Sequence, residues 1–106
     1  MGLDVYAVNS IGGPLNEEQQ KAFRDAHIRL RSIVLDKNGS NGHFRGKLFA
    51  SLVNTATGYS LYDPRIEHEE VECLLYNLRL AIEDMIELEK FFTVCVKEGL
   101  GLHGDC

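Results

Sequence analysis

The sequence predicts an all-α domain in which two shorter helices pack on one long C-terminal helix, after a short extended N-terminal segment. Three observations predict this fold. Apolar residues recur at helical spacing over three stretches of the chain, Asn16 and Asp63 precede two of them as capping residues, and glycines follow all three. With 106 residues, 44% of them hydrophobic and 25% charged, the chain has the composition of one folded unit. We therefore expect a single helical domain over 1–106.

The chain opens with residues 3–8, whose valines and tyrosine favour a strand. The following SIGGP stretch at 10–14 predicts a turn. A single strand needs a partner, and only 57–62 and the tail at 100–104 are candidates. We expect an extended segment here and leave its pairing open.

The first helix is expected to begin at Asn16, because asparagine is a good N-cap and Gln19 stands at the capping-box position. The KNG stretch at 37–39 favours its end. A second, shorter helix fits 45–56, with Gly58 as its C-terminal stop.

The C-terminal half predicts one long helix over 63–98, because Asp63-Pro64 is a cap residue followed by proline at the first helical position. Gly99 follows its end. Over the four heptads that begin at Val71, all eight a and d positions are apolar, namely Val71, Leu74, Leu78, Ala81, Met85, Leu88, Phe92 and Cys95. Further apolar residues at position e make the face wide enough for a helical bundle. Whether this helix is continuous or kinked stays open.

A second apolar group falls on the opposite flank of the same helix when positions advance by 100° per residue. One exposed apolar residue needs no explanation, but five on one flank indicate that the flank is covered. The cover is either the chain's own termini or a second subunit. The two shorter helices would leave part of the long helix uncovered, so we expect a homo-oligomer. Its interface residues are expected to be Cys73, Tyr76, Leu80, Phe91 and Val94.

Charge divides the chain into two halves. Residues 1–53 carry a net +2 and residues 54–106 a net −7, which together give the formal net charge of −5. The simpler interpretation is a basic first helix beside an acidic third helix, with exposed ion pairs worth at most about 1 kcal/mol each. The alternative is that one subunit's basic patch steers onto another's acidic helix. The acidic balance argues against nucleic acid and anionic membranes as partners.

The three cysteines, Cys73, Cys95 and Cys106, are an odd number and favour free thiols over a disulfide framework. No basic segment precedes an apolar run at the N-terminus, as a secretory signal requires. No window reaches eighteen uninterrupted apolar residues. We expect a soluble, cytoplasmic protein.

Two small groups of residues are candidate ligand sites. Arg24, His27 and Arg31 share the polar face of the first helix and could hold an anion, although such faces are routinely basic. His68 and Glu72 stand four residues apart, a spacing that brings two side chains to one metal ion. A solvated acidic first turn, which suits the helix dipole, explains the latter pair equally.

Motifs for catalysis or cofactor binding are incomplete. His103 and Cys106 make half of a zinc site, with no second pair at ligand spacing. The GHFRGK stretch at 42–47 is one residue short of a phosphate-binding loop and lacks its hydroxyl residue. No serine stands in a nucleophile-elbow context. We therefore predict no catalytic residue and no cofactor.

These observations favour a small, soluble, non-enzymatic interaction or oligomerisation protein. Its partner is expected to be a second copy of itself or another protein. The alternative is a protein or enzyme that binds a small ligand or metal in a pocket at the helix ends. The loops at 44–47 and 59–63 are the candidates for such a pocket, because both place aromatic and polar side chains there.

Overall fold

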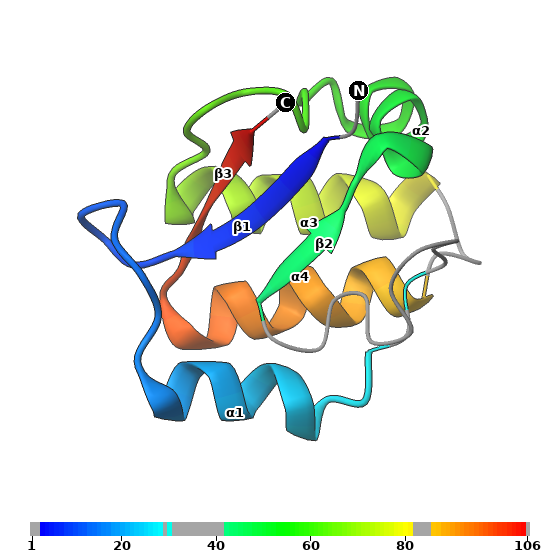
Figure 1. Cartoon of the computed structure of the whole chain (residues 1–106). Helices are drawn as coiled ribbons and strands as arrows, with labels where there is room; N and C mark the ends of the chain where they lie inside the picture. The colour runs from blue at the N-terminus through cyan, green and yellow to red at the C-terminus, as the bar shows by residue number, and fades with distance from the viewer. Residues whose placement is uncertain (1–2, 29, 31–41, 82–85, 106) are drawn as a thin grey trace.

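The fold is seen in a computed structural model, which describes residues 3–28, 30, 42–81 and 86–105 (Figure 1). The elements in chain order are β1 (Asp4–Val8), α1 (Glu17–Asp25), β2 (His43–Arg45), α2 (Lys47–Thr57), α3 (His68–Ala81), α4 (Ile86–Glu98) and β3 (Gly101–Asp105). The prediction of an all-α fold is wrong, because three of these elements form an antiparallel sheet in the order β2-β1-β3.

β1 is the central strand of the sheet. Val5 pairs with Phe44 of β2 and with Gly104 of β3, so segments from three distant parts of the chain lie side by side. The extended segment at 3–8 is therefore a strand, and of its two candidate partners the tail is the one that pairs. Its side chains alternate, with Leu3, Val5 and Ala7 buried.

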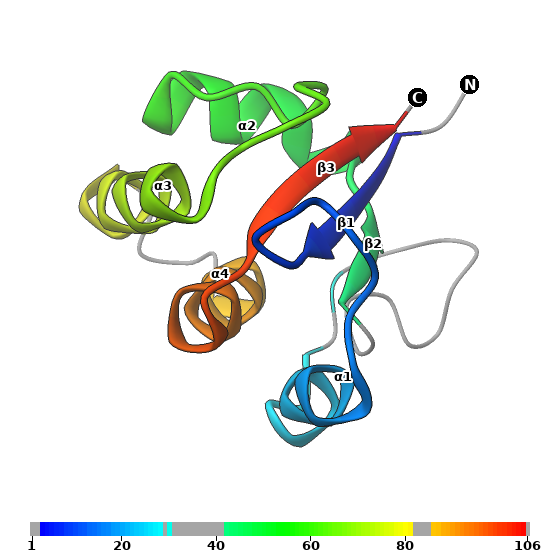
Figure 2. The same cartoon turned by 90° about the vertical axis from the view of Figure 1, so that its left-hand side faces the viewer.

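The helices lie against one face of the sheet and leave the other open. Figure 2 shows α3 and α4 on one side of the strands and α1 beside α4 at the end of the molecule. α2 packs on α3, and α3 also contacts β3. No helix within the described part of the chain is long and apolar enough to cross a membrane.

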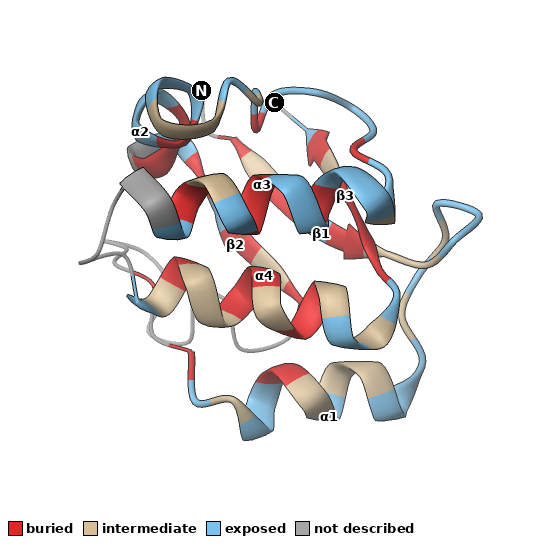
Figure 3. Ribbon diagram, turned by 180° about the vertical axis from the view of Figure 1, so that it is seen from behind, coloured by how far each residue is buried: buried red, intermediate tan, exposed pale blue. Residues whose placement is uncertain are grey.

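The prediction of one long C-terminal helix is wrong as well. α3 ends at Ala81 and α4 begins at Ile86, and the two helices pack against each other while running in opposite directions (Figures 1 and 3). The apolar heptad residues nevertheless reach one core, because each helix turns its own apolar face inward. Buried among them are Val71, Leu74, Leu78, Leu88, Phe92 and Cys95. The predicted start is also too early, since α3 begins at His68.

Two helix ends match the sequence prediction and one does not. Asn16 caps α1 through a capping box, in which its Oδ1 accepts from the Gln19 backbone N–H at 2.8 Å. Gly58 ends α2 with φ +80°. α1, however, ends at Asp25, and His27 has a left-handed φ of 53° that a continuing helix could not contain. The predicted end at 37–39 lies outside the described residues.

Aromatic rings form the centre of the core between sheet and helices. Phe91 of α4 lies 4.7 Å from Phe44 of β2 and 4.8 Å from Phe23 of α1, measured between ring centroids. All three side chains are fully buried. This cluster joins the first helix, the sheet and the last helix into one core.

The segment 61–66 runs along the outer edge of β3. Ile66 and Leu102 exchange two backbone hydrogen bonds of 2.9 and 2.8 Å, and the Gly104 N–H donates to the Asp63 carbonyl at 2.9 Å. The backbones approach so closely that a Cβ on Gly104 would overlap the Leu61 carbonyl oxygen. This contact fixes the carbonyl of Pro64 beside the sheet.

Candidate functional site on the open face of the sheet

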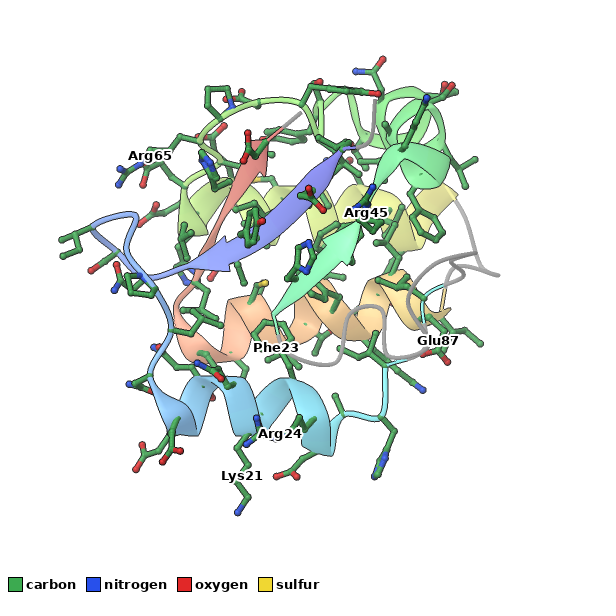
Figure 4. All side chains as sticks on the ribbon, in the orientation of Figure 1. Lys21, Phe23, Arg24, Arg45, Arg65 and Glu87 are labelled. Carbon is green, nitrogen blue, oxygen red and sulfur yellow. The ribbon has the colours of Figure 1, made fainter. Side chains whose placement is uncertain are left out.

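The alternation of each strand collects polar and aromatic side chains on the face that the helices leave open. This face is turned toward the reader in Figure 1, and Figure 4 labels Arg45 on it. The strand register arranges the side chains in two rows, each with one residue from every strand. The first row holds His43, Tyr6 and His103, and the second holds Arg45, Asp4 and Asp105.

The rings of the first row are packed side by side. His43 stacks on Tyr6 with centroids 4.6 Å apart and planes 18° apart, whereas His103 is tilted by 35° at 6.2 Å. The strand bonding explains this difference. Because Ala7 and Leu3 make the hydrogen bonds to β2, Tyr6 and His43 form a non-hydrogen-bonded pair, in which side chains stand closer.

Asp4 fixes the proton arrangement of His43. The Nε2 atom of His43 lies 2.9 Å from Asp4 Oδ1, and since a carboxylate only accepts, Nε2 carries the hydrogen. The Nε atom of Arg45 lies 3.5 Å from the same oxygen. Nδ1 of His43 makes no hydrogen bond within the described part of the chain, so the neutral ring presents a lone pair there.

A backbone carbonyl fixes the other imidazole in the same way. Nδ1 of His103 lies 2.6 Å from the Pro64 carbonyl oxygen and therefore carries the hydrogen. Nε2 of His103 has no partner among the residues that the structure describes. On either side of the Tyr6 ring, the row thus has one imidazole nitrogen without a partner among the described residues.

A pocket of about 380 Å³ adjoins this row and is lined by Tyr6, His43, His103 and the β1–α1 connection at 12–15. Asn9 holds that connection, because its Oδ1 accepts from the Gly13 N–H at 2.8 Å and the Ile11 N–H at 3.1 Å. Arg65, which Figure 4 shows beside this loop, donates from Nη2 to the Ser10 carbonyl at 3.1 Å. Hydrogen bonds made by Asn9 and Arg65 therefore hold the rim of the pocket in place.

A larger hollow of about 550 Å³ lies between α1 and α4, and three of the five charged side chains that line it, Arg79, Glu89 and Lys90, are engaged in ion pairs. Arg79 pairs with Glu89 and donates to the Thr93 hydroxyl, and Lys90 pairs with Glu87 at 3.1 Å. Its remaining lining consists of Asp25, Lys97 and apolar side chains. We place the candidate site on the sheet instead, because two ring nitrogens there have no partner among the described residues.

The residues predicted to bind a metal come together as a pair only. His68 Nε2 lies 3.4 Å from Glu72 Oε1, and His68 Nδ1 lies 3.3 Å from the Leu100 carbonyl. Within the described residues, no group of three or more His, Cys, Asp or Glu is placed to hold a metal ion. The proximity of His68 and Glu72 is that of an ordinary i, i+4 side-chain pair at the start of α3.

The predicted anion site loses the helical face on which it depended. Arg24 and His27 are both exposed, but α1 ends between them at Asp25 and the backbone turns left-handed at His27. Arg31 lies outside the described residues. Neither loop predicted as a pocket wall, 44–47 or 59–63, lines the pocket on the sheet, which is formed instead by 12–15 and by residues of the sheet such as His43.

The predicted interface residues do not form one flank, because the chain folds back between α3 and α4. Phe91 and Val94 are buried inside their own chain, at 0% and 8% exposure, and are therefore corrected to core residues. Cys73 and Tyr76 are exposed on α3, with Tyr76 64% exposed. The structure describes the backbone of Leu80 within α3 but not its side chain.

The Tyr59 hydroxyl neighbours Cys73 at the α2–α3 contact. Desolvation raises the pKa of Tyr59, and the nearby charges of Cys73 and Glu70 raise it further. Burial alone raises the pKa of the Cys95 thiol, which lies in the core of α4. Neither group faces the sheet site.

Sequence reasoning missed the sheet site because its three rings lie on segments interpreted as an extension, a loop and a tail. A weak signal was present, since polar residues alternate at positions 4 and 6, 43 and 45, and 103 and 105. Each run is too short to predict a strand alone. Only the pairing of the three runs reveals the row.

Comparisons of this chain with protein-family models, with curated proteins and with solved structures gave no match. A functional assignment therefore rests on the chemistry of the site itself. The arrangement can accept or donate protons at two imidazole nitrogens and donate a hydrogen bond from the Tyr6 hydroxyl.

Proposed function

We propose that the protein binds a small phosphate-bearing molecule on the open face of its sheet. The observation that supports this proposal is the row of His43, Tyr6 and His103, which lines the pocket and in which each imidazole has one nitrogen without a partner in the described part of the chain. Three potential donors in a row suit a group with several acceptor oxygens, as a phosphate has. The volume of about 380 Å³ lies within the range of small-molecule sites.

The phosphate group would lie over Tyr6 and accept hydrogen bonds from its hydroxyl and from the protonated imidazoles. Asp4 supports this arrangement, because its carboxylate accepts from Nε2–H of His43 and so fixes the orientation of that ring. One register step away, Arg45 stands in a row with the carboxylates of Asp4 and Asp105, so the positive charge at the site comes from the imidazoles. The organic part of the ligand would lie in the pocket against Pro14 and Leu15.

The test is a titration of ¹⁵N-labelled protein at pH 6 with inorganic phosphate and with phenyl phosphate, followed by NMR of the backbone and imidazole nitrogens. We expect the signals of Tyr6, His43 and His103 to shift and saturate. The double variant His43→Gln, His103→Gln should abolish the shifts. His68→Gln is the matched control, since this half-buried histidine lies outside the row.

Saturating shifts that are confined to other residues, or no shifts with either phosphate, would contradict the proposal. A stronger response to phenyl phosphate than to inorganic phosphate supports the pocket as the place of the organic group.

A second candidate is self-association through the outer face of α3, as the sequence suggests. The observation in its favour is the 64% exposed ring of Tyr76, with Cys73 also exposed on the same helix. This surface is acidic at Glu69, Glu70 and Glu72, and the basic residues of the 21–47 stretch in a second copy would complement it. Only part of the predicted flank remains in this proposal.

A further inference from the structure

We infer that the sheet face is also a catalytic site, at which His43 acts as a general base and His103 as a general acid. The substrate is a phosphodiester with a hydroxyl group on the neighbouring carbon. This inference rests on the proposed function, because it requires a phosphate over Tyr6. It goes further in assigning a reaction and a separate role to each imidazole.

The base assignment follows from the Asp4–His43 pair. Since Nε2–H is held by Asp4 Oδ1 at 2.9 Å, the lone pair of the neutral ring is on Nδ1. A carboxylate in this position fixes the tautomer and stabilises the imidazolium that forms when the ring takes a proton. His43 is thus prepared to remove a proton from a substrate hydroxyl.

The acid assignment follows from the contact between His103 and Pro64. The carbonyl of Pro64 holds Nδ1–H, so a second proton on this ring must reside on Nε2, the exposed nitrogen. The carbonyl is fixed in place, because Asp63 and Ile66 on either side of it bond to the backbone of β3. His103 is thus positioned to deliver a proton to a leaving oxygen.

The spacing of the two rings suits an in-line reaction. Their centroids lie 4.6 and 6.2 Å from that of Tyr6, which places them at most about 11 Å apart. In a diester poised for attack the base and acid nitrogens are at most roughly 10 Å apart, from two hydrogen bonds of about 2.9 Å, an attack distance near 3.2 Å and one P–O bond. The substrate therefore bridges the row above the Tyr6 hydroxyl.

The reaction balances without a further reactant. Nδ1 of His43 takes the hydroxyl proton as that oxygen forms a bond to phosphorus. The bond from phosphorus to the leaving oxygen breaks, and Nε2–H of His103 protonates this oxygen. The products are a cyclic phosphodiester and an alcohol, and solvent returns the two rings to their starting protonation states. The Tyr6 hydroxyl donates a hydrogen bond to another phosphate oxygen and so stabilises the negative charge on it.

The surroundings of the row favour a small substrate. The pocket holds about 380 Å³, which matches one nucleoside-sized group. The formal net charge of −5 opposes the accumulation of a long polyanion on the protein. We therefore assign a diester of dinucleotide size rather than a polymer.

The experiment compares two substrates that differ in the need for an acid. Uridylyl-(3′→5′)-adenosine has an alkoxide leaving group, which needs a proton, and 2-hydroxypropyl 4-nitrophenyl phosphate has a nitrophenolate, which leaves without one. We expect His43→Gln to lower the rate on both substrates by about 100-fold or more. His103→Gln should lower the rate on the dinucleotide to a similar degree and change the nitrophenyl rate by less than about threefold.

His68→Gln, purified by the same procedure, is the control and should retain both rates. Unchanged rates in His43→Gln would show that the activity comes from a contaminating nuclease and would overturn the proposal. Circular dichroism of each variant confirms that it is folded. Equal losses on both substrates in His103→Gln would overturn the acid role. Phosphate-induced shifts at Tyr6 without turnover of either substrate would overturn catalysis while leaving the proposed binding function intact.

Discussion

His43 stacks on Tyr6 across the β1–β2 pair, with ring centroids 4.6 Å apart and planes 18° apart. The stack joins a residue of the N-terminal strand to one that lies 37 positions later in the sequence. It also holds the Tyr6 ring on edge, so that its hydroxyl rather than its face is offered to a ligand. The following predictions separate the role of this hydroxyl from that of the ring and extend to the core and to α3.

Tyr6→Phe should weaken binding of phenyl phosphate about tenfold, because it removes one hydrogen bond to a charged group, worth about 1.5 kcal/mol. The ring stack survives, so the free energy of unfolding should change by less than about 0.5 kcal/mol. Calorimetric titration and urea unfolding measure the two effects. Tyr62→Phe, which alters another exposed tyrosine, should change neither the affinity for phenyl phosphate nor the free energy of unfolding. An unchanged affinity in Tyr6→Phe would show that the Tyr6 hydroxyl does not contact the ligand.

Phe91→Ala should lower the free energy of unfolding by about 3–5 kcal/mol, since it leaves a cavity at the junction of α1, β2 and α4. Urea unfolding followed by circular dichroism measures the loss. Tyr76→Ala is the comparison, because this ring is 64% exposed and its removal should change stability by about 0.5 kcal/mol or less. Similar losses for the two variants would be incompatible with a buried Phe91.

Cys73 should react with iodoacetamide in the native protein while Cys95 does not, because Cys73 is exposed and Cys95 is buried with a raised pKa. The raised pKa also makes stability depend on pH. The contribution of Cys95 is fully present below the unfolded thiol pKa of about 8.5 and decreases as the pH rises above it. Peptide mass spectrometry locates the label, and urea unfolding at pH 7.5 and 9.5 measures the decrease.

Cys95→Ala is the control for this pH effect, since it should have a smaller loss of stability between the two pH values than the parent protein. Equal labelling of both cysteines under native conditions would contradict the burial of Cys95.

Tyr76→Glu should lower the association state and leave the helical circular dichroism unchanged, if the outer face of α3 joins two copies. Size-exclusion chromatography with light scattering gives the mass of each species. Tyr62→Glu is the matched surface variant, because Tyr62 is exposed outside α3. A parent protein that is monomeric at high concentration would rule out self-association through this face.

Local features of the fold could be predicted and distant pairings could not. The capping box at Asn16 and the left-handed stop at Gly58 depend on a few adjacent residues, and both occur as expected. The apolar periodicity of the C-terminal half correctly identifies core residues such as Leu78 and Phe92. The periodicity does not show where one helix ends and an antiparallel helix begins, because an apolar repeat reports only which side of a helix is apolar.

The candidate site depends on the part that could not be predicted. Tyr6, His43 and His103 become neighbours through strand pairing, and no spacing between them in the sequence reports that contact. β2 has only three residues, so its alternation is indistinguishable from that of a loop. The glycines of β3 weaken its strand pattern in the sequence, whereas in the fold Gly104 is required by the close approach of the 61–66 segment.

The pairing of β1 with β3 matches Asp4 to Asp105, so it closes a loop that contains almost the entire chain. Contacts of such large sequence separation carry a high loop-closure entropy and form late compared with local helices. Any state that has its helices but has not yet closed this loop keeps a helical spectrum and lacks the His43–Tyr6–His103 row entirely. Ligand binding on this face would therefore report completed folding of the chain, which helical content alone cannot do.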